Sequence, residues 1–344
     1  METDGHFNGD YGPQRLSVEL ANICNLHCSY CFRSEDNLYS HHAAFFPVAL
    51  LRRVIDEARE AAQITHVNFT GGEPALHPQF AEVLETVAAA NLQASFVTNG
   101  WHFERIWPAL LANRDAISHV AFSIDGIDRE THDAWRGNDS FERLVRAFSR
   151  CYIARLPFVI KIVVRRDLMD QLEQIAIFAA RMGAAALNFV HVMPTSNSAE
   201  NDLALNRDEQ RAAEEEIAIL ARIFKMNIGI DVGYYNVDVQ RAPCAPLAGT
   251  SMNVDYRGRL SLCCNLSGFR GATEEADVVA DLNVEPFAAA LAKLRALASA
   301  QLHKRREALV TLHSKGLTPD LYLGSPCLFC LQSYGKIPWH NGAH

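Results

Sequence analysis

The sequence has no apolar run of about 18 residues, no long block of lysine and arginine, and no low-complexity tract or internal repeat. The first absence excludes a conventional transmembrane helix. The net charge is −8, and the densest basic patch is only Lys304-Arg305-Arg306. Neither a nucleic-acid partner nor an anionic membrane surface is therefore expected. The polar segment 1–14 also lacks the basic-then-apolar order of a signal peptide, which predicts a cytoplasmic protein with a flexible N-terminal tail.

Length and composition favour a folded chain with a substantial core. The 344 residues are 49% hydrophobic and 21% charged, which excludes the disordered class and allows one large domain plus a smaller one. Nine cysteines are present, an odd number in tight clusters, and no secretion signal accompanies them. This pattern favours metal ligands or catalytic thiols over disulfides.

Strand-like and helix-like segments alternate over the first 195 residues, and six strands with a helix after each of the first five predict parallel βαβ units. The expected strands are 16–20, 66–69, 94–97, 119–123, 158–164 and 186–192, and the helices are 47–62, 78–90, 103–112, 140–154 and 169–182. The expected fold class is α/β, a partial (β/α)6 barrel resembling an open TIM barrel, with its chemistry at the carboxyl ends of the strands.

Four segments are predicted along the chain: the tail 1–14, the barrel 15–195, a linker helix and strand 196–239, and a small C-terminal module 240–344. Asn206 is a plausible cap for a helix over 206–226, with Glu209 in its first turn. In the module, Asp255 to Gly258 is expected to turn a hairpin between 251–254 and 260–262. A long helix is predicted over 286–311.

Cys24, Cys28 and Cys31 directly follow the first strand with the spacing C-x3-C-x2-C. Three thiolates on a short loop can bind three irons of a cubane cluster and leave the fourth iron open for a chelating ligand. Zinc is the alternative, but closed structural zinc sites use four ligands, and no fourth cysteine or well-placed histidine follows.

This motif, with Tyr30 just before the last cysteine, resembles that of the radical S-adenosylmethionine (SAM) superfamily. The stretch Gly71-Gly72-Glu73-Pro74 at the end of the second strand also resembles that family, in which it holds the methionine amino group of the cofactor. The resemblance covers about 15–192. It implies a 4Fe–4S cluster and SAM as cofactors, with the methionine amine and carboxylate on the open iron and Glu73 accepting hydrogen bonds from the amine.

Later strand ends carry further candidates for the cofactor's ribose and carboxylate. These residues are Thr98, Asn99, Ser123 and Arg165. For Arg165 the alternative is a solvated surface side chain, as for its neighbour Arg166.

The C-terminal cysteines form a second constellation, in which Cys244 and Cys263 are followed much later by Cys327-x2-Cys330. It resembles the auxiliary-cluster modules called SPASM and twitch, and four cysteines match the shorter twitch type with one 4Fe–4S cluster. The alternative is a zinc ribbon.

Two cysteines remain. Cys151 lies among apolar residues near the end of a helix and is expected in the core. Cys264 adjoins a proposed ligand and is a spare thiol, an alternative ligand, or a catalytic hydrogen-atom donor. Adjacent strand residues face opposite sides, so Cys264 is expected to face away from a cluster held by Cys263, toward either the barrel mouth or solvent.

The resemblance implies reductive cleavage of SAM to a 5′-deoxyadenosyl radical that takes a hydrogen atom from a substrate carbon, with a flavodoxin- or ferredoxin-type electron donor. We expect net oxidation, dehydrogenation or cross-linking, in natural-product biosynthesis, with redox-neutral epimerisation through a cysteine thiol as the alternative. The substrate is expected to be a small molecule or a ribosomal peptide; the early first strand favours a small molecule or a separately presented peptide. A non-catalytic iron–sulfur or zinc protein is the rival of another class.

Overall fold

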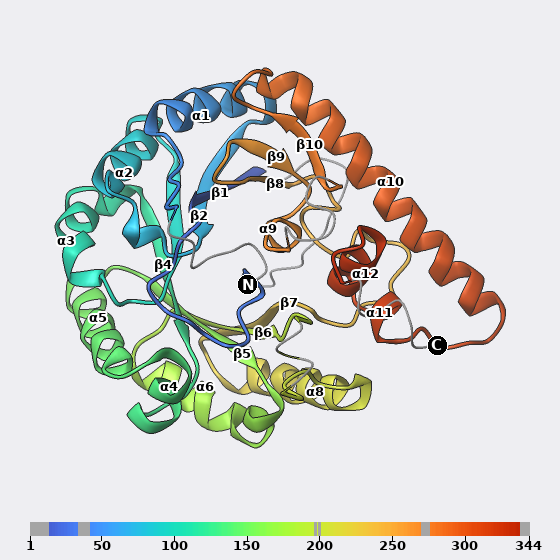
Figure 1. Ribbon diagram of the computed structural model, residues 1–344. Helices are drawn as coiled ribbons and strands as arrows, with labels where there is room; N and C mark the ends of the chain where they lie inside the picture. The colour runs from blue at the N-terminus through green and yellow to red at the C-terminus, as the bar shows by residue number, and fades with distance from the viewer. Residues whose placement is uncertain (1–13, 34–41, 196–197, 199–200, 270–275, 338–344) are drawn as a thin grey trace.

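The computed structural model describes residues 14–33, 42–195, 198, 201–269 and 276–337. Within them, ten strands form one sheet in the order β10-β9-β8-β1-β2-β3-β4-β5-β6-β7. Figure 1 looks along the curved sheet, whose helices lie on its outer side. The chain is therefore a mixed α/β fold built as a partial barrel.

The barrel consists of seven parallel strands, each paired in order with the next along the chain. The strands are β1 (Gln14–Ala21), β2 (Ile64–Gly71), β3 (Gln93–Thr98), β4 (Ile117–Ile124), β5 (Phe158–Val164), β6 (Ala186–His191) and β7 (Asn227–Val232). The helices are α1 (Val48–Ala62), α2 (Phe80–Ala89), α3 (Phe103–Ala112), α4 (Arg129–Arg136), α5 (Ser140–Ala154), α6 (Leu172–Arg181) and α8 (Arg207–Ile223).

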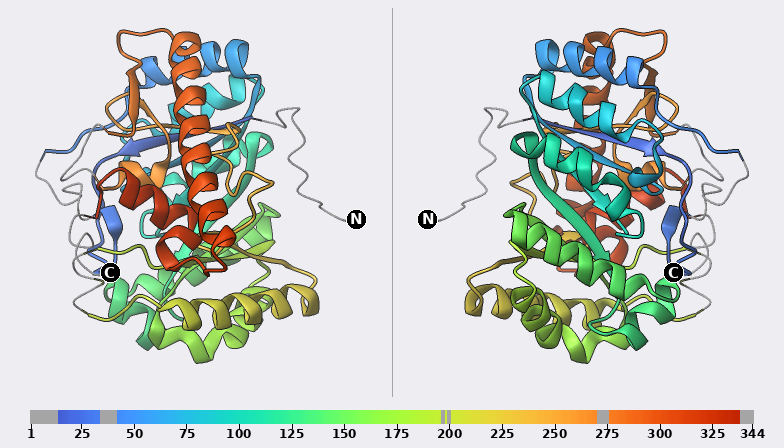
Figure 2. Two further views of the ribbon diagram at one scale, coloured as in Figure 1. Left: turned by 90° about the vertical axis from the view of Figure 1, so that its right-hand side faces the viewer. Right: turned by 90° about the vertical axis from the view of Figure 1, so that its left-hand side faces the viewer.

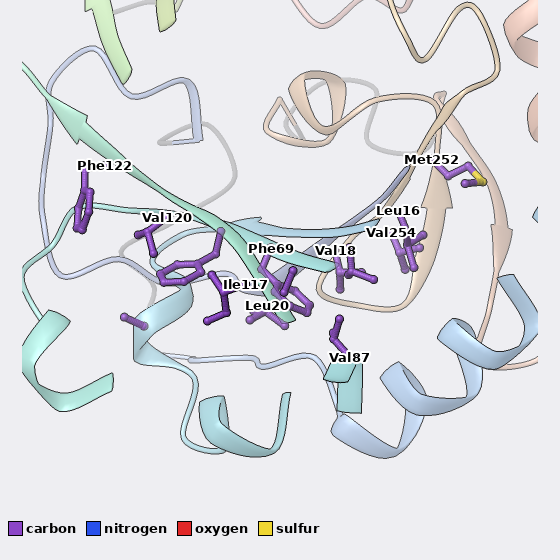
Figure 3. Close-up of a cluster of buried hydrophobic side chains, with 14 of the residues drawn as sticks. Leu16, Val18, Leu20, Phe69, Val87, Ile117, Val120, Phe122, Met252 and Val254 are labelled. Carbon is purple, nitrogen blue, oxygen red and sulfur yellow. The ribbon is translucent and has the colours of Figure 1, made fainter. Parts of the chain in front are cut away.

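The hydrophobic core lies between the sheet and the helices. Leu16, Val18 and Leu20 project from one face of β1 and are fully buried, with Phe69 of β2 and Val87 of α2 in the same cluster (Figure 3). Period-two alternation puts every second strand residue on this face. The expected burial of Cys151 in this core is confirmed.

The opposite face of the strands is polar and only half-buried. Asn68, His119, Lys161 and Asn188 alternate there with the buried core residues of four strands. Asp231 occupies the register irregularity between β6 and β7, and its carboxylate pairs with Lys161 and accepts a 3.0 Å hydrogen bond from Asn188. This face, which we call the barrel lumen, is therefore lined with charged and hydrogen-bonding groups.

The C-terminal module extends the same sheet. β8 (Ser251–Val254) pairs in parallel with β1, and β9 (Arg259–Ser261) and β10 (Val278–Asp281) follow antiparallel. The predicted hairpin turn is confirmed, with Gly258 at φ 86°. The long helix α10 (Phe287–Ser314) runs along one side of the molecule (Figure 2). The short helix α11 (Leu321–Gly324) contacts α10, and α12 (Pro326–Ser333) contacts both α11 and α9 (Cys264–Ser267).

Several sequence predictions can be compared directly. The tail 1–14 lies outside the described residues except Gln14, which begins β1. Asn206 caps α8 in a full capping box with Glu209. Helix α4, after β4, was not anticipated. Among the described helices, none is both long and apolar enough to cross a membrane.

Candidate functional site

The loop after β1 carries Cys24, Cys28 and Cys31, all half-buried free thiols. The N–H of Cys31 donates to the carbonyl of Cys28 at 3.0 Å, which closes a tight turn between the last two cysteines. Burial, together with the charges of Glu73 and the other two thiols, raises the pKa of Cys24 to about 12. Such thiols become thiolates only when a cation stabilises them, which fits a metal-binding loop.

A single-ion site is a poor match for these side chains. Among the described residues, no three His, Cys, Asp or Glu side chains converge on a point where one metal ion could sit. Tetrahedral zinc requires such convergence, whereas a cubane cluster binds each thiolate at a different iron. The three-cysteine loop therefore fits a cluster better than zinc.

Gly71 and Gly72 allow β2 to approach the cysteine loop closely. The N–H groups of Gly72 and Glu73 donate to the carbonyls of Ala21 and Ile23, each at 2.8 Å. A Cβ on Gly72 would lie 1.9 Å from the Ile23 oxygen, and Gly71 has φ 121°. The paired glycines thus fix the backbone immediately before Cys24, and the buried Pro74 turns the chain away into a short 3-10 helix, η2 (Pro74–Leu76).

Glu73 is buried beneath this loop and accepts several hydrogen bonds. Its Oε1 accepts from the Thr98 hydroxyl at 2.7 Å and from the Ala75 N–H at 3.0 Å, while Oε2 accepts from the Asn99 N–H at 2.7 Å. Burial raises the pKa of Glu73, and these donors oppose that rise. A carboxylate has about four acceptor positions, so one remains for an amine.

Thr98 and Asn99 therefore contact the glutamate and the cysteine loop. The Asn99 amide also lies 3.7 Å from the Cys24 sulfur and donates to the Asn25 side chain at 3.1 Å. Both residues sit at the end of β3, where the sequence placed them. These contacts of Thr98 and Asn99 orient Glu73 and the cysteine loop, which are expected to bind the cofactors.

Asp125, a fully buried carboxylate just after β4, has a role that the sequence did not predict. Tyr30, Arg136 and Arg165 all donate to it, the last at 2.9 Å. Arg136 is the last residue of the unanticipated helix α4 and also donates to the Tyr30 hydroxyl at 2.9 Å. Asp125 thus ties the tyrosine of the cysteine motif to two strand ends. In the sequence, the sign of this role was a single acidic residue in the polar stretch at the end of the fourth strand.

Arg165 is fully buried, so the solvated alternative is wrong. Its guanidinium binds Asp125 and Asp167, and it stacks 3.9 Å from the centre of the Trp135 ring. Ser123 is half-buried on the lumen face of β4, opposite Lys161 of β5 in the register. The described contacts therefore join Tyr30 and Arg165 through Asp125, while Ser123 stands apart from that network.

The four proposed auxiliary ligands meet in the C-terminal module. Cys244, Cys263, Cys327 and Cys330 line one small cavity whose other walls are mainly apolar, including Leu247, Leu262 and Leu331. Burial raises the pKa of Cys330 to about 12, and burial with the charges of Cys327 and Cys330 raises that of Cys244. Sequence positions nearly 90 apart are therefore brought to a single enclosed site.

Cys264 begins helix α9 instead of continuing strand β9, so strand alternation does not set its orientation. Cys263 lines the four-cysteine cavity, whereas Cys264 is not among the lining residues. The Ser267 hydroxyl donates to the Cys264 carbonyl at 2.9 Å and to Glu19, which lies on the lumen face of β1 and pairs with Arg33 at 2.8 Å. The start of α9 therefore lies beside the barrel lumen. The interaction with Cys263 lowers the pKa of Cys264, burial opposes it, and the charge of Arg33 lowers it further.

Comparison with known proteins decides the family. The model of the radical SAM superfamily matches residues 18–179, which contain the cysteine loop, the glycine pair, Glu73 and Asp125. Residues 18–179 belong to the radical SAM superfamily. The cofactors of this family are a 4Fe–4S cluster and SAM, and the cysteine loop and Glu73 described above fit both.

Relatives and solved structures agree with this assignment. Over 202 residues the chain is 33% identical to the mycofactocin maturase MftC of Mycolicibacterium smegmatis, covering 58% of this chain and 50% of that protein. It is 25% identical over 256 residues to the PqqA peptide cyclase of Gluconobacter oxydans, covering 73% and 70%. The chain thus spans about half the length of the first of these relatives.

Among solved structures, native anSMEcpe with bound AdoMet and the Cp18Cys peptide aligns with a TM-score of 0.65 at 17% identity. The alignment covers 84% of this chain and 83% of that one. At this identity the likeness establishes the fold alone. It extends well past residue 179, so most of the chain shares this architecture.

Proposed function

We propose that this radical SAM chain inverts a carbon centre in a peptide substrate without net oxidation, with Cys264 as the hydrogen-atom donor. The observation that carries the proposal is the position of Cys264 at the start of α9, which the Ser267 hydroxyl links to Glu19 on the lumen face of β1. A thiol at the barrel mouth can reach a substrate held there. This position favours the redox-neutral outcome over the oxidation expected from the sequence.

When bound, the cluster and SAM supply a 5′-deoxyadenosyl radical that removes a hydrogen atom from a substrate carbon. Glu73, oriented by Thr98 and Asn99, holds the cofactor's amine. Asp125 fixes Tyr30 of the cysteine loop. The Cys264 S–H bond then breaks as a new C–H bond forms on the opposite face of the substrate carbon. Each turnover takes two electrons from a flavodoxin- or ferredoxin-type partner: one is consumed in the reductive cleavage of SAM, and the other, with one proton, restores the Cys264 thiol.

A peptide is the favoured substrate because of the relatives' own substrates. PqqA peptide cyclase acts on a peptide, and anSMEcpe was solved with one. The lumen described above also offers what a peptide backbone needs, since Lys161, Asp231 and Asn188 together provide hydrogen-bond donors and acceptors. Both arguments support a polar substrate rather than an apolar one.

We further propose that Cys244, Cys263, Cys327 and Cys330 hold a second 4Fe–4S cluster. Four thiols around one cavity, of which Cys330 is buried and the others half-buried, are the number that closes a cubane cluster completely. This centre also supports the competing outcome, in which the substrate radical loses an electron and the product is oxidised.

The deciding experiment is turnover in deuterium oxide, after the substrate has been found by comparing the peptides of a deletion strain and its parent. Wild type should give an isomeric product one mass unit heavier, with deuterium at the inverted carbon. Cys264→Ala should still cleave SAM but lose both inversion and deuterium. Cys151→Ala, which removes a thiol buried in the core, is the matched control and should keep both. A product two mass units lighter, without carbon-bound deuterium, would refute inversion and establish oxidation.

A further inference from the structure

Helix α10 carries a buried guanidinium, that of Arg305, one turn after a residue that contacts Cys330, and no carboxylate of the described residues pairs with it. Arg305 of α10 is 1% exposed, and its Nη2 donates to the carbonyls of Asn236, Leu323 and Gly324. Its Nε makes no hydrogen bond within the described residues, and no described Asp or Glu forms an ion pair with it. Burying an uncompensated charge costs several kcal/mol, roughly, so a negative counter-charge is expected nearby.

Three of the four thiols around the cavity are within electrostatic reach of this guanidinium. Burial raises the pKa of Cys244, Cys327 and Cys330, and the charge of Arg305 opposes that rise at each. As ligands these thiols are deprotonated, and a cluster with four thiolates carries net negative charge. A filled cavity therefore supplies the counter-charge that the guanidinium otherwise lacks.

Gln301 acts on the same site from one turn earlier in α10. Residues four apart lie on the same face of a helix, so Gln301 and Arg305 face the cavity together. The Gln301 amide Nε2 donates to the Cys330 sulfur at 3.5 Å, and the side chain is 6% exposed. One helix face thus directs a hydrogen bond and a positive charge at the auxiliary cysteines.

We propose that Gln301 and Arg305 are positioning residues that raise the reduction potential of the auxiliary centre. This inference rests on the auxiliary cluster proposed above. Reduction adds an electron to an already anionic centre, so a nearby cation and a hydrogen bond to a ligand sulfur favour the reduced state. The centre would then accept electrons more readily than the same four thiolates in an apolar shell.

The test is an anaerobic redox titration followed by electron paramagnetic resonance. The background is the full chain with Cys24, Cys28 and Cys31 replaced by Ala, which leaves only the auxiliary site. Gln301→Leu and Arg305→Met should each move the midpoint potential to more negative values. Arg305→Lys, which keeps the charge, should stay near the background. Lys293→Met is the control, because it removes an exposed positive charge from the same helix and should change nothing.

The outcomes separate this inference from the proposed cluster. If the background variant binds no iron, the auxiliary cluster itself is refuted. If it binds four irons but neither Gln301→Leu nor Arg305→Met moves the midpoint, only the role of this helix face is overturned. If Arg305→Met fails to hold iron while Arg305→Lys holds it, the guanidinium acts as the counter-charge. Gln301→Leu keeps Arg305 intact and tests the hydrogen bond independently.

Discussion

Replacing Gly72 by Ala should disable the site through the backbone, without removing any ligand. The added Cβ would lie 1.9 Å from the Ile23 carbonyl oxygen and 2.4 Å from its carbon. Ordinary contact begins at 3.4 Å, so the Ile23 backbone would have to move by about 1.5 Å. The next residue is Cys24, and that displacement passes directly to the first cluster ligand.

Two general magnitudes give the expected effect of Gly72→Ala on stability and on the rate of SAM cleavage. Overpacking of this kind costs about 1–3 kcal/mol in the free energy of unfolding. A misplacement of about 1 Å at a reacting site lowers the rate about 100-fold, so SAM cleavage by the dithionite-reduced protein should fall by at least that factor. Iron content and the rate of 5′-deoxyadenosine release are the two assays.

Gly229→Ala is the matched control. Gly229 lies in the barrel strand β7, and a Cβ there would meet nothing within 4 Å. This variant should retain wild-type iron content and cleavage. Wild-type cleavage by Gly72→Ala would refute the claim that the glycine pair fixes the cysteine loop by close approach.

Three further predictions follow from the same site. Replacing Cys24, Cys28 and Cys31 together by Ala should reduce the iron content after reconstitution from about eight to about four per chain and abolish SAM cleavage. Cleavage by that variant would contradict the assignment of these cysteines to the SAM-binding cluster. Glu73→Gln turns an amide donor toward the Thr98 hydroxyl or the Asn99 N–H. SAM binding measured by calorimetry should therefore weaken roughly tenfold, about 1.4 kcal/mol, and unchanged binding would remove Glu73 from the site. Burial lowers the pKa of His132 from 6.5 to about 4, so the unfolded chain binds this proton at a higher pH than the folded chain does. The free energy of unfolding should therefore fall as the pH drops from 6.5 to 4. In denaturant titrations His132→Gln should flatten this dependence on pH, and an unchanged slope would exclude His132 as a cause.

The sequence was informative where local patterns determine structure. Alternation and helical spacing located six barrel strands and their helices, because burial on one face imposes a fixed period. The two cysteine sets and the glycine pair were identified from spacing, and the cavity lined by Cys244, Cys263, Cys327 and Cys330 matches the predicted set.

The interactions that the sequence did not reveal depend on contacts between distant segments. Asp125 gathers Tyr30, Arg136 and Arg165 from three different segments, and no spacing rule connects them. Cys264 was treated as a strand residue, but a helical turn begins there, so the alternation rule does not determine its orientation. Side-chain position at such a boundary depends on backbone dihedrals that composition does not determine.

The parallel pairing of β8 with β1 has a consequence for synthesis of the chain. β1 lies inside the sheet only because β8, more than 200 residues later, covers its second edge. Until Val254 has left the ribosome, β1 therefore presents an open row of backbone donors and acceptors to other nascent chains. Pairings of such long sequence separation also form slowly. A truncation before residue 251 would leave this edge exposed permanently, so the auxiliary module protects the barrel from aggregation independently of any metal that it binds.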